Sequence, residues 1–148
     1  MAALPDKIKL DIVIPDRPLF SGEVDEVSVP GENGYLGILP GHAPLLSELR
    51  IGEIMYRQGD QRSYLFCSWG FVEVLPDHVS VLAEVAERPD QIDVSRAQEA
   101  KEEAEMELKS QDPNTDYAAA RVALEEATAR LQVASKTGAA GGTRQRTE

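Results

Sequence analysis

The hydrophobic pattern of this 148-residue sequence changes period at one place, the tripeptide Arg88-Pro89-Asp90. Before it, short runs of apolar residues alternate with polar ones, a pattern typical of half-buried β-strands. After it, small and apolar residues recur every three or four positions, as on one face of an amphipathic helix. The sequence therefore predicts two parts, a β domain over residues 1–88 and a helical part over residues 89–136.

The β part starts with a regular alternation of isoleucine and leucine, which Pro15-Asp16-Arg17-Pro18 ends with turn-forming residues. The apolar parity then flips near Asp25-Glu26, which predicts a bulge or a bend. Further apolar runs, separated by turn sequences rich in Gly, Pro, Asn and Asp, cover residues 35–39, 45–49, 53–57, 63–67, 71–75 and 78–85. Many short strands joined by such turns indicate an antiparallel sandwich or barrel.

The helical part begins at Asp93, a residue type that caps helix N-termini well. A first helix is predicted over residues 94 to about 111, and Asp112-Pro113-Asn114-Thr115 ends it. Because the connection is short, the second helix should lie antiparallel to the first in an αα-hairpin. The predicted stripe of the first helix is Val94, Ala97, Ala104 and Leu108, interrupted by Lys101, and that of the second is Tyr117, Ala120, Leu124, Ala127, Leu131 and Ala134.

A seam made mostly of alanine brings two helices close but buries little apolar area. We therefore expect the hairpin to be the least stable unit of the chain, able to open without melting the β domain. The residues that follow it, 137–148, include a Gly-Ala-Ala-Gly-Gly run and are predicted to be disordered.

Composition argues against several functions. A formal charge of −11 makes nucleic-acid binding and attraction to anionic lipid unfavourable. No apolar run approaches the ~20 residues of a membrane span, and the N-terminus lacks the pattern of a signal peptide. We expect a soluble, cytoplasmic chain that reaches a membrane only through a protein partner. Neither a metal-binding spacing nor a set of catalytic residues is recognisable.

Two alternatives stay open at this level. One is a β-sandwich module that binds carbohydrate or peptide and dimerises through its helices. It predicts exposed aromatic residues, and most of the few aromatics here fall inside strand runs. The other is an enzyme that uses Cys67 as its nucleophile, which predicts a thiol that reacts quickly at neutral pH.

Specific segments resemble one known family, the epsilon subunits of F-type ATP synthases. The stretches that carry the likeness are Val13 to Val24, Val29-Pro30-Gly31, Leu36 to Leu46 (with its LPGHAPLL sequence), Trp69 to Val74, Val79 to Ala83 and Ile92 to Ala97. They occur in the family's order and spacing, from about residue 8 to residue 135. The resemblance implies an N-terminal antiparallel β-sandwich followed by an antiparallel helical hairpin.

The resemblance also implies partners and a function. The sandwich would bind the gamma subunit and rest on the ring of c subunits, at the cytoplasmic face of a bacterial inner membrane. The hairpin would fold down or extend toward the alpha and beta catalytic subunits, where in many members it inhibits ATP hydrolysis. The chain would not be a catalyst itself, since the whole complex makes ATP as protons cross the membrane.

Two residues are implied in the contact with the c ring. His42 lies in the turn Pro40-Gly41-His42-Ala43-Pro44, which the resemblance places against the loops of that ring; an exposed turn histidine without a role is the alternative. Many members carry an acidic residue just before the Leu-Gly pair, where this chain has Tyr35. Glu32 is the nearest acid that can replace it.

A second implied site is regulatory ATP, which the folded form of some members binds. The matching residues are Glu87, Asp93, Arg96, Ala97 and Arg130, with Asp93 meeting base or ribose and Arg96 meeting phosphate. The alternative is that Asp93 only caps its helix and that Arg96 pairs with a nearby carboxylate. Two positions that are arginine in nucleotide-binding members are Glu103 and Glu126 here. This double charge reversal predicts weak binding.

Overall fold

The computed structural model describes the backbone of residues 4–147 and the side chains of residues 4–136. The chain divides into two compact units, Met1–Ala86 and Glu87–Glu148, which we describe separately. The sequence predicts that the helical part ends at residue 136 and that residues 137–148 are disordered, whereas the backbone of helix α2 continues through Thr147. The side chains of residues 137–148 lie outside the described part of the chain.

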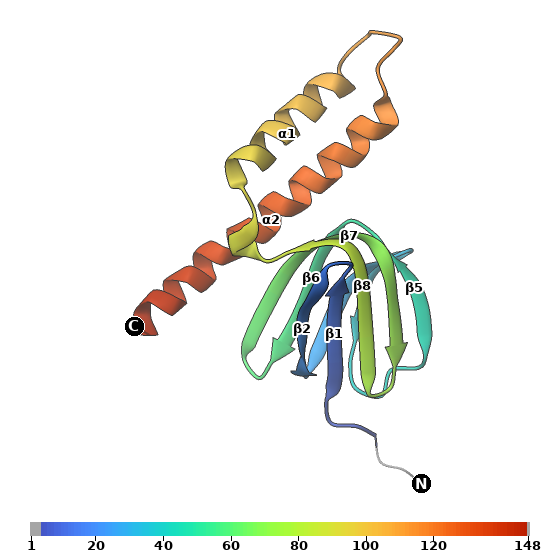
Figure 1. Ribbon diagram of the computed structural model, residues 1–148, viewed down its shortest axis with the longest axis vertical. Helices are drawn as coiled ribbons and strands as arrows, with labels where there is room; N and C mark the ends of the chain where they lie inside the picture. Colours follow the sequence, from blue (N-terminus) through green and yellow to red (C-terminus); the bar gives the residue numbers. More distant parts are fainter. Residues whose placement is uncertain (1–3, 148) are drawn as a thin grey trace. The chain divides into compact units, whose positions relative to one another are not determined.

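The first unit is a β-sandwich, as predicted (Figure 1). Its strands are hydrogen-bonded in the order β2-β1-β8-β7-β5-β3-β4, with β6 pairing β3 and β7. The strands are β1 (Ile8–Ile14), β2 (Arg17–Val24), β3 (Glu26–Gly31), β4 (Gly34–Ile38), β5 (Leu45–Leu49), β6 (Gly52–Gln58), β7 (Gln61–Leu75) and β8 (His78–Glu87).

The sheet is not purely antiparallel. The pairs β1–β2, β3–β4, β5–β7 and β6–β7 are antiparallel, but β1 and β8 run parallel, with Leu10 opposite Val79 and Ile12 opposite Val81. Strands joined by a tight hairpin must be antiparallel, whereas β1 and β8 come from opposite ends of the domain and escape that constraint. The expectation of an antiparallel sandwich needs this one correction.

The core follows the predicted alternation. Ile8, Leu10 and Ile12 are 0% exposed, while Lys9 and Asp11 between them face outward. Branched aliphatic side chains supply most of the remaining core: Val24, Val27, Val29, Ile38, Leu49, Ile54, Leu65, Val72, Val74, Val79 and Val81. All residues of this core cluster lie in the first unit, so the sandwich has a hydrophobic core of its own.

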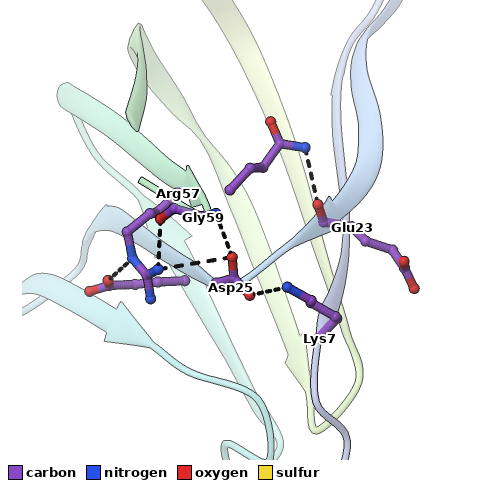
Figure 2. Close-up of polar contacts among 7 residues, drawn as sticks. Lys7, Glu23, Asp25, Arg57 and Gly59 are labelled. Carbon is purple, nitrogen blue, oxygen red and sulfur yellow. Dashed lines mark hydrogen bonds and ion pairs between the residues drawn. The ribbon is translucent and has the colours of Figure 1, made fainter. Parts of the chain in front are cut away.

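The predicted parity flip is a bend at Asp25, which separates β2 from β3 (Figure 2). The Asp25 carboxylate accepts a hydrogen bond from the backbone N–H of Gly59 (2.7 Å) and forms an ion pair with Lys7. The Arg57 guanidinium lies 3.9 Å from the same carboxylate and pairs with Glu26 at 3.1 Å. The Gly59 N–H, and after it Lys7, lowers the pKa of Asp25. The Asp25 carboxylate therefore fixes the corner between β2, which pairs with β1, and β3, which pairs with β4 and β6.

A second corner divides β7. Its first half pairs with β6 up to Cys67, and its second half pairs with β5 from Gly70. Between them Trp69 has φ 58° and Gly70 has φ 139°, both in the left-handed half of backbone space. A Cβ on Gly70 would lie 1.9 Å from the Leu82 carbonyl oxygen, so glycine alone allows β8 to approach this closely. Two predicted strands, 63–67 and 71–75, are therefore one bent strand.

Strand β2 was missed by the sequence pattern, which ended at the turn before it. Only Pro15 and Asp16 form the turn, and Arg17 already pairs with Ile14. Strand β2 lies at the end of the hydrogen-bonding order, and most of its side chains are exposed or half-buried. An edge strand of this kind lacks the apolar alternation that reveals a strand with one buried face.

The second unit is the predicted hairpin, with a 3-10 turn η1 (Pro89–Gln91) and helices α1 (Val94–Leu108) and α2 (Tyr117–Thr147), which lie side by side (Figure 1). Asp93 caps α1 as predicted, because its Oδ1 accepts from the Arg96 N–H at 3.1 Å. Asp116 does the same for α2 through the Ala119 N–H at 3.0 Å. Helix α1 ends about three residues earlier than predicted, since the Ser110 N–H turns to the Glu107 carbonyl.

Alanine dominates the buried positions of the two helices, and Val133 of α2, at 0% exposed, is the larger side chain among them. Ala97 and Ala104 are the buried residues of α1, and Ala120 and Ala127 of α2 are 1% and 2% exposed. Val94, predicted on the stripe, is instead 52% exposed. One buried methyl contributes about 0.8 kcal/mol, so these four alanines supply only about 3 kcal/mol. Within the described residues, no helix has the length and apolar character needed to cross a membrane.

Candidate functional site

The turn that holds His42 follows β4 and is tied to the turn between β7 and β8. Gly41, with φ 87°, donates its N–H to the Pro76 carbonyl at 2.7 Å. The His42 Nδ1 lies 2.7 Å from the Ala43 carbonyl oxygen. A carbonyl can only accept, so Nδ1 carries the proton and Nε2 of the neutral ring is left as an acceptor.

The structure does not bring Glu32 and His42 together. Glu32 is an exposed residue of the turn before β4, and its backbone N–H donates to Ser47 Oγ at 3.3 Å. His42 follows the other end of β4, and a five-residue strand spans roughly 16 Å. Tyr35 lies over the start of β6, where its hydroxyl accepts from the Glu53 N–H at 3.0 Å. The two predicted c-ring residues therefore belong to separate loops.

By contrast, the residues of the predicted ATP site all line one cavity of about 400 Å³ in the second unit. Its lining consists of Glu87, Gln91, Asp93, Arg96, Ala97, Ala100, Ala123, Glu126, Ala127 and Arg130. This volume lies within the range of small-molecule sites, about 300–1,000 Å³.

Three elements position these side chains. Glu87 is the last residue of β8, Asp93 and Arg96 belong to the start of α1, and Glu126 and Arg130 lie one helical turn apart on α2. Alanines of both helices form the floor, and their short side chains leave the space open. The feature that weakens the hairpin seam thus also creates its cavity.

Two contacts fix the positions of charged side chains in the cavity. The Arg130 Nε donates to Glu87 Oε1 at 2.8 Å, and each of these side chains is about 30% exposed. The Asp93 carboxylate is engaged as the cap of α1. Capping therefore accounts for one oxygen of Asp93, while Arg130 pairs with a carboxylate 43 residues away in the sequence.

Some lining residues were not predicted. Gln91 belongs to η1, where its Oε1 accepts from the Arg88 N–H at 2.8 Å. Ala100 and Ala123 gave no signal in the sequence, because alanine in a helix fits a close seam between helices as well as an open cavity. Of the two unfavourable acids, Glu126 lines the cavity, whereas Glu103 is an exposed residue that is not among its lining residues.

The nucleophile alternative loses its support. Cys67 is 0% exposed, its thiol lies 3.7 Å from the Arg50 carbonyl oxygen, and burial raises its pKa to about 12. A thiol with such a pKa is almost wholly protonated at neutral pH and does not react as a thiolate.

Two of the aromatic residues in the strand runs are largely exposed. Phe71 is 53% and Tyr35 is 59% exposed. Phe71 and Leu82 border an apolar groove of about 370 Å³ in the first unit, together with Val13 and Pro15. This groove is therefore a candidate interaction surface of the sandwich.

Comparisons with known proteins agree with this architecture. The profile of the ATP synthase delta/epsilon chain β-sandwich domain matches residues 7–89, and that of the delta/epsilon long α-helix domain matches residues 90–135. The ATP synthase epsilon chain of Koribacter versatilis is 53% identical over 74% of this chain and 78% of its own length. The epsilon chain of Geobacter metallireducens is 44% identical over 90% of this chain and 98% of its own length.

Two solved structures share the fold. One is a chain of the Euglena gracilis mitochondrial ATP synthase OSCP/F1/c-ring assembly, with a TM-score of 0.76, 24% identity and coverage of 86% of this chain and 81% of that chain. The other is from the central stalk/c-ring of the Tetrahymena thermophila mitochondrial ATP synthase, with a TM-score of 0.52, 11% identity and coverage of 91% and 98%.

Proposed function

Because the chain belongs to the ATP synthase delta/epsilon family, we propose that it is a non-catalytic central-stalk subunit that couples rotation of the c ring to the catalytic head through the gamma subunit. The assembled complex makes ATP as protons cross the membrane. The chain is a peripheral component at the cytoplasmic face of a bacterial inner membrane, held there by its protein partners.

The observation that carries the proposal is the difference between the two units. The sandwich has a continuous aliphatic core, whereas the buried residues of the two helices are mostly alanine. An anchor must stay folded under torque, and a mobile brake must open at small cost in free energy. In this proposal the sandwich is the anchor, and the opened hairpin reaches the alpha and beta subunits and slows ATP hydrolysis.

Separate surfaces of the sandwich serve its two partners. The apolar groove beside Phe71 and Leu82 receives an apolar side chain of gamma, since burying these exposed groups favours association. The turns that hold Glu32 and His42 meet polar loops of the c ring. This assignment rests on the exposure of the groove and on family membership.

The hairpin cavity takes regulatory ATP, which favours the folded hairpin by binding only that form. Arg96 and Arg130 meet phosphate, and Asp93 and Glu87 accept hydrogen bonds from the nucleoside. Binding is weak, because Glu126 places a negative charge where a phosphate would be stabilised by a positive one.

ATP hydrolysis by a catalytic complex depleted of this subunit tests the brake. The complex is titrated with the whole chain and with a chain that ends after Asp90, which keeps all residues of the sandwich core cluster. We expect both to bind gamma and only the whole chain to slow hydrolysis. Equal rates with both chains bound would leave coupling as the function and remove the brake.

Binding to gamma tests the groove independently. We expect Phe71→Asp to weaken binding to isolated gamma by about tenfold or more, since a charge would be buried at the interface. Leu39→Asp is the matched control, because Leu39 is similarly exposed (56%) and is not among the residues that line the groove. Equal losses for the two variants would show that the groove is not the contact.

A further inference from the structure

The charges around the hairpin cavity restrict the form of nucleotide that it can hold. Its lining contains three carboxylates, from Glu87, Asp93 and Glu126, and two guanidinium groups, from Arg96 and Arg130. The lining therefore carries one negative charge in excess at neutral pH. Free ATP adds a highly charged anion, which this lining disfavours.

One of the two guanidinium groups already has a carboxylate partner. Arg130 already pairs with Glu87 at 2.8 Å, so a phosphate that recruits Arg130 must share it with a carboxylate. Glu126 lies four residues before Arg130 on α2, which puts the two on one face of the helix. Two carboxylates therefore adjoin the guanidinium that a phosphate would approach.

A divalent cation resolves this conflict. Mg²⁺ is bound in proteins through one or two carboxylates together with phosphate oxygens and water. Within the described part of the chain, no group of three or more His, Cys, Asp or Glu side chains could hold a metal ion alone. The cation would have to arrive with the phosphates.

We propose that the cavity selects the magnesium complex of ATP over free ATP, and that Glu126, with Glu87, is the reason. This inference rests on the proposed binding of ATP in the hairpin. Glu126 acts as a specificity-determining residue: it repels free triphosphate and accepts the complex, in which the metal carries positive charge to the carboxylates.

Isothermal titration calorimetry of the full chain tests the proposal. ATP is titrated with excess Mg²⁺ and with EDTA at matched ionic strength, and Mg²⁺ is titrated alone. We expect binding about tenfold tighter with Mg²⁺, roughly the effect of one unit charge at a partly screened site. Mg²⁺ alone should give no saturable heat.

Glu126→Gln should bind free ATP more tightly and reduce the preference for the magnesium complex to about threefold or less. Glu103→Gln makes the same chemical change on an exposed part of α1 outside the lining, and should keep the wild-type preference. Circular dichroism of both variants checks that the hairpin stays helical.

The outcomes distinguish a failure of magnesium selection from a failure of ATP binding. If the wild-type chain binds ATP equally well or better in EDTA, or if Glu126→Gln keeps the full preference, the selection is refuted and ATP binding stands. If no titration shows binding, both the selection and the regulatory ATP site are refuted.

Discussion

Replacing Gly70 by alanine should be among the most damaging single-methyl changes in the sandwich. Gly70 has φ 139°, and an added Cβ would lie 1.9 Å from the Leu82 carbonyl oxygen and 2.9 Å from its carbon. These atoms belong to the backbone of β8, so the strand itself would have to move. Alanine thus meets both an unfavourable backbone conformation and an overlap that no side-chain rotation relieves.

The expected magnitude follows from those two terms. A non-glycine residue held in such a region costs about 1–3 kcal/mol, and overpacking a well-filled site costs about 1–3 kcal/mol. Together they predict a loss of about 2–6 kcal/mol in the free energy of unfolding. Small domains have about 5–15 kcal/mol in total, so the variant approaches the limit of folding.

Urea denaturation measures this loss, with Trp69, the single tryptophan of the chain, as a fluorescent probe beside the mutated position. Gly37→Ala is the matched control. It lies in β4, a Cβ there meets no atom within 4 Å, and its φ is outside the positive region. We expect this control to stay within about 1 kcal/mol of wild type.

A Gly70→Ala chain whose stability lies within about 1 kcal/mol of wild type, with an unchanged denaturant slope, would refute the reasoning. It would mean that β8 moves away from β7 at little cost. Far-UV circular dichroism followed in parallel guards against a purely local change in the fluorescence of Trp69.

Three further predictions concern other parts of the chain. Asp25→Asn should destabilise the sandwich at pH 7, and the difference from wild type should vanish in acid. The pKa of Asp25 is lowered in the folded state, so the stability that its carboxylate contributes is complete above the ordinary pKa of 3.8 and is lost as the pH falls through the folded-state pKa. A pH-independent difference in urea midpoint would contradict this. Asp93→Ala should cost about 1 kcal/mol of hairpin stability and Asp93→Asn much less, because asparagine also caps helices; equal losses in thermal melts of the hairpin would show that capping is not the role of Asp93. Amide hydrogen exchange should be faster in α1 than in β7, and equal protection would remove the basis for a mobile hairpin.

The sequence alone was sufficient to predict the features that depend on residues a few positions apart. The alternation at Ile8, Leu10 and Ile12 gave the buried face of β1, and the parity flip gave the bend at Asp25. Asp93 gave the start of α1, and the break at residues 112–115 gave the hairpin. Each of these depends on side chains a few positions apart, which is the range over which periodicity and capping act.

Tertiary structure alone decided what depends on distant residues. The parallel pairing of β1 with β8, the close approach of β8 to Gly70 and the contact of Glu87 with Arg130 join residues far apart in the sequence. The family resemblance named five residues for the ATP site, but no local pattern showed that alanines would leave a cavity between them. Nor did any local signal place Glu126 in that lining and Glu103 outside it, because which acid faces a cavity depends on how two helices pack rather than on either helix by itself.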